Sequence, residues 1–397
     1  MGIKLTLLIV FFVVMVGVGL YSRKHTASVD GFVLGGRSVG PWLTAFAYGT
    51  SYFSAVVFVG YAGQFGWKYG IASTWIGIGN AVIGSLMAWV VLGRRTKVMT
   101  QHLGSKTMPD FFGERYGSKA LKIMASAIVF VFLVPYTASI YNGLSRLFEM
   151  AFHIPYAYCV AGMAVFTGIY VILGGYMATA INDFIQGIIM LLGIVAVIAA
   201  VLSGQGGFLE AIRKMAEIPS DLPVTMGQPG AFTSFFGPDP WNLLGVIILT
   251  SLGTWGLPQM IGKFYAIKDE KSINTGTVIS TLFACVVAGG SYFLGGFGRL
   301  FDSSEIYDET GSVVFDSIVP HMLSSLPDLL IGIVVVLVLS ASMSTLASLV
   351  LTSSSTLTLD FLKDNVMKNM SEKKQIRWMQ FLVVFFIGSV SYTHLRA

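Results

Sequence analysis

Strongly apolar segments alternate with short polar stretches along the whole chain. Ten such segments are found, at residues 3–22, 40–66, 70–93, 121–150, 156–175, 181–203, 241–262, 274–298, 329–359 and 378–393. Most contain about 20 residues or more, which is the length of α-helix that crosses the hydrocarbon core of a bilayer. The pattern therefore predicts an all-α polytopic membrane protein, with the lipid bilayer as a partner.

Composition strengthens this prediction. Hydrophobic residues make up 54% of the 397 residues, charged residues only 11%, and the mean hydropathy is +0.74. Soluble domains contain about 25% charged residues, so this chain has too few to cover a soluble surface. A soluble enzyme is thus excluded, and no segment has the spacing of a catalytic or metal-binding motif.

The basic residues are distributed unevenly between alternate loops. If the N-terminus lies outside, the inner loops carry 18 of the 25 Lys and Arg residues. By the positive-inside rule, this bias predicts a multi-pass protein of the plasma membrane with its N-terminus outside. The net charge of +5 then reflects membrane orientation, and no nucleic-acid partner is expected.

Two of the expected helices look interrupted near the middle of the membrane. The second segment contains glycine and hydroxyl residues at 49–54, and the seventh contains a similar run at 250–258 that ends in Pro258. Proline removes a helical hydrogen bond, and a broken backbone is tolerated in a membrane where a polar cavity or other groups satisfy it. The breaks lie five segments apart, which predicts a five-plus-five inverted repeat around a central site. Ordinary helix kinks remain the alternative.

The ninth segment carries a stripe of small and hydroxyl-bearing residues. Ala341, Ser344, Thr345 and Ser348 stand at positions i, i+3, i+4 and i+7, so they share one helix face. Neutral oxygens on such a face suit a hard cation such as sodium. The alternative is that these residues bond to their own helix or allow close helix packing.

Three stretches together resemble the sodium/solute symporter family. They are Leu34-Gly35-Gly36-Arg37-Ser38-Val39-Gly40-Pro41, Gly49-Thr50-Ser51-Tyr52-Phe53-Ser54 and Ala341-Ser342-Met343-Ser344-Thr345. The resemblance implies a leucine-transporter-like fold in one transmembrane domain, 1–397. Its parts would be an extra N-terminal helix at 3–22, a first repeat at 40–203 and a second repeat at 241–397. The second repeat looks incomplete, so the chain is expected to be part of a longer protein.

The resemblance also implies site residues. The main sodium site would use the backbone carbonyls of Thr50, Phe53 and Ala341 with the hydroxyls of Ser344 and Thr345. Asp183 and Ser348 would form a second ion site or an exit station, although an Asp at a helix start can equally be an N-cap. The substrate would be bound by Ser51, Ser54, Tyr141, Thr250, Thr254, Trp255, Pro258 and Gln259.

The implied function is sodium-coupled import of a small organic solute by alternating access, with sodium as the coupling ion and no other cofactor. Proline-transporting members carry an acid at the position of Tyr52 and aromatic residues at those of Thr250 and Thr254. The solute is therefore expected to be monocarboxylate, pantothenate-like or an amino acid, closer to the first two. Tyr52 and Trp255 are also explained by helix packing. Proton coupling and a membrane sensor module of a signalling protein remain alternative functions.

Overall fold

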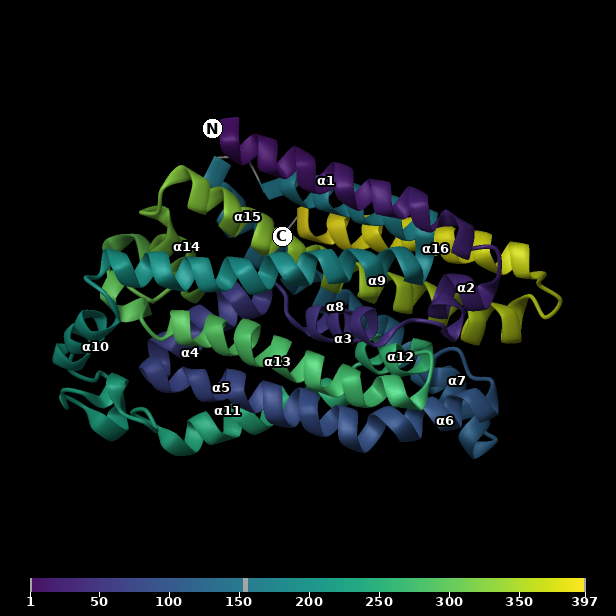
Figure 1. The fold of residues 1–397 in the computed structure, drawn as a ribbon, viewed down its shortest axis with the longest axis horizontal. Coiled ribbons are helices and arrows are strands. Elements are labelled where there is room, and N and C mark those ends of the chain that lie inside the picture. The colour runs from purple at the N-terminus through teal and green to yellow at the C-terminus, as the bar shows by residue number, and fades with distance from the viewer. Residues whose placement is uncertain (1, 153–155, 396–397) are drawn as a thin grey trace.

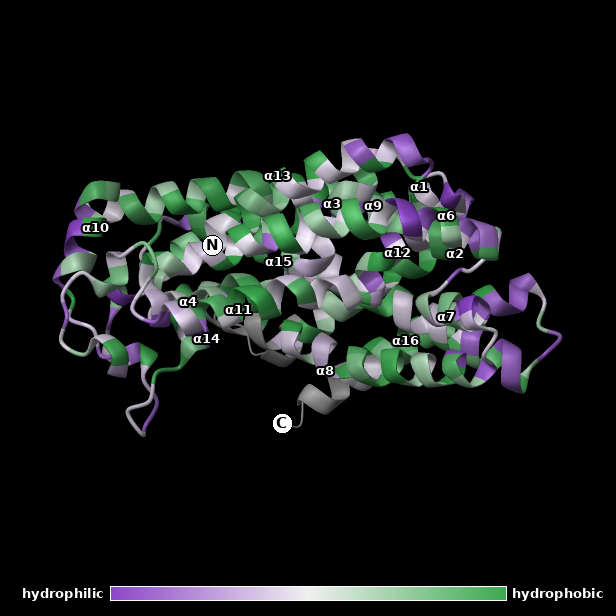
Figure 2. Cartoon of the chain, turned by 90° about the horizontal axis from the view of Figure 1, so that it is seen from below, coloured by the Kyte–Doolittle hydropathy of each residue, from purple (hydrophilic) through white to green (hydrophobic). Residues whose placement is uncertain are grey.

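The computed structural model describes residues 2–152 and 156–395 as an elongated bundle of helices (Figure 1). Across these residues, β-pairing is limited to two isolated bridges, Val39 with Ile267 and Tyr307 with Val313. Hydrophilic residues gather at the two ends of the bundle and hydrophobic residues fill its middle (Figure 2). This arrangement is that of a polytopic helical membrane protein, as the sequence predicts.

Within the part of the chain that the structure describes there are sixteen α-helices, some extended by 3-10 or π-helical segments. Their bounds are α1 Gly2–Ser22, α2 Val29–Leu34, α3 Pro41–Tyr52, α4 Ala62–Tyr69, α5 Thr74–Gly79, α6 Arg94–Leu103, α7 Met108–Tyr116, α8 Lys119–Phe152, α9 Tyr156–Gly204, α10 Phe208–Glu217, α11 Pro240–Gly253, α12 Pro258–Ala266, α13 Glu270–Gly295, α14 Phe315–Ser324, α15 Asp328–Thr356 and α16 Glu372–Leu395. Shorter helical segments lie between them. They include the π-helices η3 Val56–Tyr61, η5 Asn80–Met87 and η12 Leu357–Val366 and the 3-10 helices η9 Thr254–Gly256 and η10 Gly298–Phe301.

Fewer separate spans are found than the ten apolar segments. Among the described residues, six continuous helices are long and apolar enough to cross a membrane, and the bent pair 240–256 and 258–266 would make a seventh. Part of the difference arises at α9, which contains the segments at 156–175 and 181–203 on the two sides of a kink. They join at Gly175, whose φ of 53° favours glycine.

Both predicted interruptions are present. α3 ends at Tyr52, Phe53 adopts an extended conformation, and helical structure resumes before η3. α11 ends at Gly253, and Leu257 is extended just before Pro258 begins α12, with a bend of 50° across the break. The two breaks therefore provide the irregular backbone that the sequence indicates.

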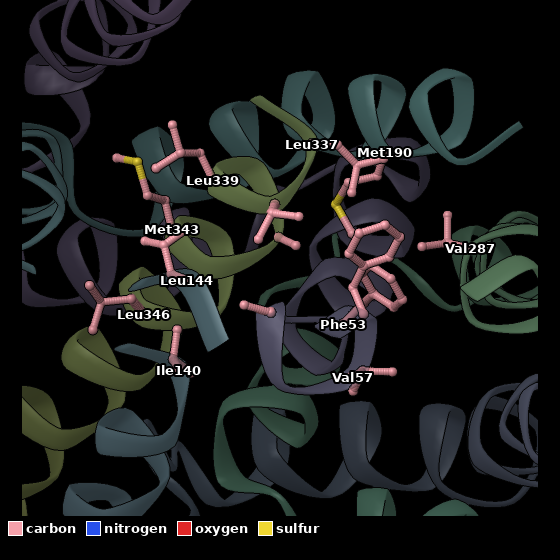
Figure 3. Close-up of a cluster of buried hydrophobic side chains, with 14 of the residues drawn as sticks. Phe53, Val57, Ile140, Leu144, Met190, Val287, Leu337, Leu339, Met343 and Leu346 are labelled. Carbon is pink, nitrogen blue, oxygen red and sulfur yellow. The ribbon is translucent and has the colours of Figure 1, made fainter. Parts of the chain in front are cut away.

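The most buried long helix is α15, which lies at the centre of the bundle. It packs against α1, α3, α8, α9 and α16, and almost every side chain from Ile331 to Thr356 is buried. Figure 3 shows apolar side chains around it, including Ile140 of α8, Met190 of α9 and Phe53 at the first break. A helix that is surrounded on all sides in this way holds its polar groups in a nearly water-free environment.

Glycines allow α4 and α13 to cross at very short range. A Cβ added at Gly66 would overlap the backbone carbonyl of Gly295, and one at Gly295 would overlap the backbone of Ala62. Such overlap with rigid backbone requires the two helices to separate. The close crossing fixes α4, which follows the first break, against α13.

The variant Gly66→Ala should therefore lower stability by on the order of 1–3 kcal/mol or more, the cost of overpacking. Gly245→Ala, on an open face of α11 where an added Cβ meets nothing within 4 Å, is the matched control. Thermal unfolding of the purified protein in detergent measures both. Equal midpoints for the two variants would show that the crossing can relax.

Candidate functional site

Five oxygens from α15 and the first break converge into one cluster. The Ser344 hydroxyl lies 3.1 Å from the carbonyl oxygen of Thr50 and 3.0 Å from that of Ala341. The Thr345 hydroxyl lies 3.1 Å from the Thr50 carbonyl, and it is 3.3 Å from the carbonyl of Phe53. It also lies 3.1 Å from the Ala341 carbonyl. All five residues are at most 2% exposed. The structure thus brings together every residue of the predicted sodium site.

The cluster has more acceptors than donors. Its two hydroxyls carry two protons, yet they face three carbonyl oxygens across five short contacts. Because α3 ends at Tyr52, no following helical turn supplies an amide to the Thr50 carbonyl. The surplus of partial negative charge in a buried place fits a small cation, so the residues present suit sodium.

Bonding within the helix, the alternative explanation for the hydroxyl stripe, is also observed. Both hydroxyls contact the Ala341 carbonyl one turn earlier on α15. Their contacts with Thr50 and Phe53 nevertheless cross to another helix, which intrahelical bonding does not require. The stripe therefore joins α15 to the break in α3.

The structure corrects the N-cap interpretation of Asp183. The residue lies well inside α9, eight residues beyond Gly175, and is fully buried. Its carboxylate accepts no hydrogen bond from a helix amide; its partner is the Lys263 ammonium at 3.7 Å, an ion pair too long for a hydrogen bond. The N-cap interpretation is wrong because the second part of α9 begins just after Gly175, about two helical turns before Asp183.

Lys263 is likewise displaced from its expected place. Residue 263 directly follows the seventh apolar segment, 241–262, and is one of the 18 basic residues expected in the inner loops, whereas the structure buries it on α12. Its ammonium donates to the Ser348 hydroxyl at 3.0 Å, and the Ser348 and Ser51 hydroxyls lie 2.9 Å apart. The sequence did not identify Lys263 as a site residue. Its position five residues after Pro258, on the second half of a broken helix, is the feature that could have indicated a place near the site.

A cavity of about 540 Å³ lies beside both breaks and α8. Four of the predicted substrate residues line it: Ser54, Thr250, Thr254 and Pro258. The rest of its lining consists of apolar side chains, glycines, the hydroxyl of Ser139 and the rings of Tyr52, Tyr61 and Tyr136. The cavity is therefore mainly apolar, with hydroxyl groups at the broken backbone.

The other predicted substrate residues do not line this cavity. Ser51 contacts Ser348, and the Trp255 indole donates to the Ile83 carbonyl at 2.9 Å, as expected of a packing residue. Gln259 lines a smaller cavity with Lys263, while Tyr141 is buried within α8. Binding of substrate by these four residues stays a prediction.

Asn80 joins the two breaks, and the sequence did not single it out. Its side-chain carbonyl accepts hydrogen bonds from Thr250 at 3.2 Å and Ser251 at 3.1 Å, both on α11. Its amide donates to the Tyr52 hydroxyl at 3.1 Å. An Asn in an apolar segment, buried within the membrane, is the signal that indicates such a role.

The bundle, the paired helix breaks and the oxygen cluster together define a multi-pass membrane transporter. A profile of the Sodium:solute symporter family matches residues 32–396. "Sodium/proline symporter 2" of Staphylococcus saprophyticus subsp. saprophyticus is 31% identical over 368 residues, covering 90% of this chain and 68% of that protein. "Sodium/proline symporter" of Staphylococcus aureus (strain JH9) is 31% identical over 364 residues, covering 89% and 67%.

A solved structure confirms the fold. It is the substrate-bound outward-open state of a Na+-coupled sialic acid symporter, with a TM-score of 0.82 and 14% identity, covering 99% of this chain and 82% of that one. The chain belongs to the sodium:solute symporter family. It is a sodium-coupled solute transporter and not an enzyme, with sodium as the coupling ion.

Loss of a hydroxyl from the oxygen cluster should weaken sodium binding. Ser344→Ala and Thr345→Ala each remove on the order of 1–3 kcal/mol of polar interaction, which corresponds to about 5- to 150-fold in ion affinity. Sodium titration of solute uptake measures the change. The control is Ser340→Ala, which removes a buried hydroxyl that has no hydrogen-bond partner. The same shift in all three variants would mean that the hydroxyls serve packing.

Proposed function

We propose that this protein imports a small organic solute bearing a carboxylate, together with one sodium ion bound by Thr50, Phe53, Ala341, Ser344 and Thr345. The observation that carries the proposal is the convergence of these five oxygens at the first break. Ser54 is the next residue after Phe53 and lines the large cavity. Sodium binding at the break would therefore order the backbone that faces the solute.

The cavity supports a solute with one polar end. Its lining contains aliphatic and aromatic side chains, hydroxyls and backbone, and none of its lining residues is charged. Helical structure resumes beside the cavity after Ser54 and at Pro258. The first amides of a helix lack intrahelical partners and carry partial positive charge, which suits a carboxylate. The two similar Staphylococcus proteins are sodium/proline symporters, which favours an amino acid or another small carboxylate.

Orientation follows from the charged ends of the bundle. In Figure 2 the end of the bundle near α2, α6 and α7 is largely hydrophilic. Its basic residues include Arg94 and Arg95 at the start of α6 and Lys106 between α6 and α7, and Lys373 and Lys374 lie in the first turn of α16. We place this end inside, which puts the N-terminus outside in the plasma membrane. Removing Lys263 from the loop count leaves the inner excess of basic residues intact.

The coupling ion is tested by uptake into proteoliposomes that contain the purified protein. Solutes to be screened are radiolabelled proline, other small amino acids and monocarboxylates. An inward sodium gradient should drive accumulation, and an equal potassium gradient should not, because the five-oxygen site contains no carboxylate to carry a proton. Equal uptake without sodium at a fixed proton gradient would contradict the proposal.

Cysteine protection tests the location of the solute. In a background with Cys159 and Cys285 replaced by Ala, saturating solute should slow labelling of Ser54→Cys by a thiol reagent several-fold. The control is Ser203→Cys, at the exposed end of α9, whose labelling should be unaffected. If solute leaves both labelling rates unchanged, the cavity beside the breaks does not hold it.

A further inference from the structure

The Lys263 ammonium occupies a position built for a cation. The Lys263 side chain is 3% exposed and that of Asp183 is 0% exposed. The ammonium lies 3.7 Å from the carboxylate, 3.0 Å from the Ser348 hydroxyl and 5.1 Å from the centre of the Tyr176 ring. A carboxylate, a hydroxyl and an aromatic face are all groups that attract a monovalent cation.

A small cavity, lined by apolar side chains and by hydroxyl groups, adjoins this position. A cavity of about 40 Å³ touches Lys263 and Ser348 and extends to Lys106 and Thr107, in the loop between α6 and α7. It is also lined by three further hydroxyl residues of α15: Thr352, Ser355 and Thr356. Together with Ser348 they continue the face that carries Ser344 and Thr345. Since a space of about 10–15 Å³ already holds a water molecule, this cavity has room for an ion with two or so water molecules.

The Asp183 carboxylate cannot remain unbalanced in this environment. Neither of its oxygens has a hydrogen-bond partner, and removing an ion from water costs several kcal/mol. In its ionised form the carboxylate therefore needs a countercharge. In this chain the countercharge is the Lys263 ammonium, which is part of α12. Its presence therefore does not depend on the sodium concentration.

We propose that the Lys263 ammonium is a resident cation that fills the place which Asp183 and Ser348 would otherwise offer to sodium. Lys263 therefore decides the ion stoichiometry: the chain binds one sodium, and loss of the ammonium creates a second sodium site. The count of one rests on the proposed function, which places the first sodium at the five-oxygen cluster. The second site depends on different residues.

The same contacts give Lys263 a positioning role. It connects α12 to α9 through the ion pair with Asp183 and to α15 through the hydrogen bond to Ser348. Ser348 in turn contacts Ser51, the residue after Thr50. A mobile ion at this position would leave these helices connected only while it was bound.

Equilibrium binding of ²²Na⁺ to the purified protein tests the proposal. The original chain and Lys263→Arg, which retains the positive charge, should each bind one sodium. Lys263→Met, which keeps an apolar stem and removes the charge, should bind two. Lys263→Met/Asp183→Asn removes both charges and should bind one again.

The Ser344→Ala background separates this proposal from the first sodium site. There, Lys263→Met should retain a sodium that the further change Asp183→Asn abolishes. If Ser344→Ala leaves sodium binding of the original chain unchanged, the proposed first site is wrong, while the second site can still be observed in Lys263→Met.

Two results would overturn the proposal. One is a folded Lys263→Met that binds the same number of sodium ions as the original chain. The other result comes from the stability of Lys263→Met in different buffers. Sodium that binds only the folded variant should stabilise it. If Lys263→Met aggregates equally in sodium and potassium buffers while Lys263→Met/Asp183→Asn folds, the position does not accept sodium. Recovery of Lys263→Met in sodium alone would support the proposal.

Discussion

The arrangement of the site depends on one constraint: the break in α3 leaves backbone carbonyls without partners in their own helix. In a membrane interior such carbonyls have no water to bind, so another polar group must meet them. The hydroxyls of Ser344 and Thr345 do so from α15, within about 3 Å. The cluster still has more acceptors than donors, and this imbalance is what supports the proposed sodium site.

The central position of α15 connects the separate parts of the site. Ser344 and Thr345 contact the break in α3, and one turn later Ser348 contacts both Ser51 and Lys263. On the other side, Asn80 links Tyr52 at the first break to α11 at the second. The two broken helices are therefore joined by hydrogen bonds at two levels.

Some site residues were predictable from the sequence and others were not. The stripe of Ser344, Thr345 and Ser348 was visible because helical periodicity alone places these residues on one face. Asp183 was wrongly expected as a possible cap because its helix start was inferred from where apolar residues resume. Lys263 is expected in a loop because the seventh apolar segment ends at residue 262, and the nearby carboxylate that makes its burial tolerable comes from another helix.

The sequence by itself determined the membrane class, the positions of both breaks and the hydroxyl face, since hydropathy, helix-breaking residues and helical period are local properties. It also indicated the family through short motifs. Only the tertiary structure decided which groups meet across helices: Lys263 with Asp183, Ser348 with Ser51, and Asn80 with both breaks. These pairs join residues 28 to 297 positions apart, and their contacts arise from helix packing, which no local pattern specifies.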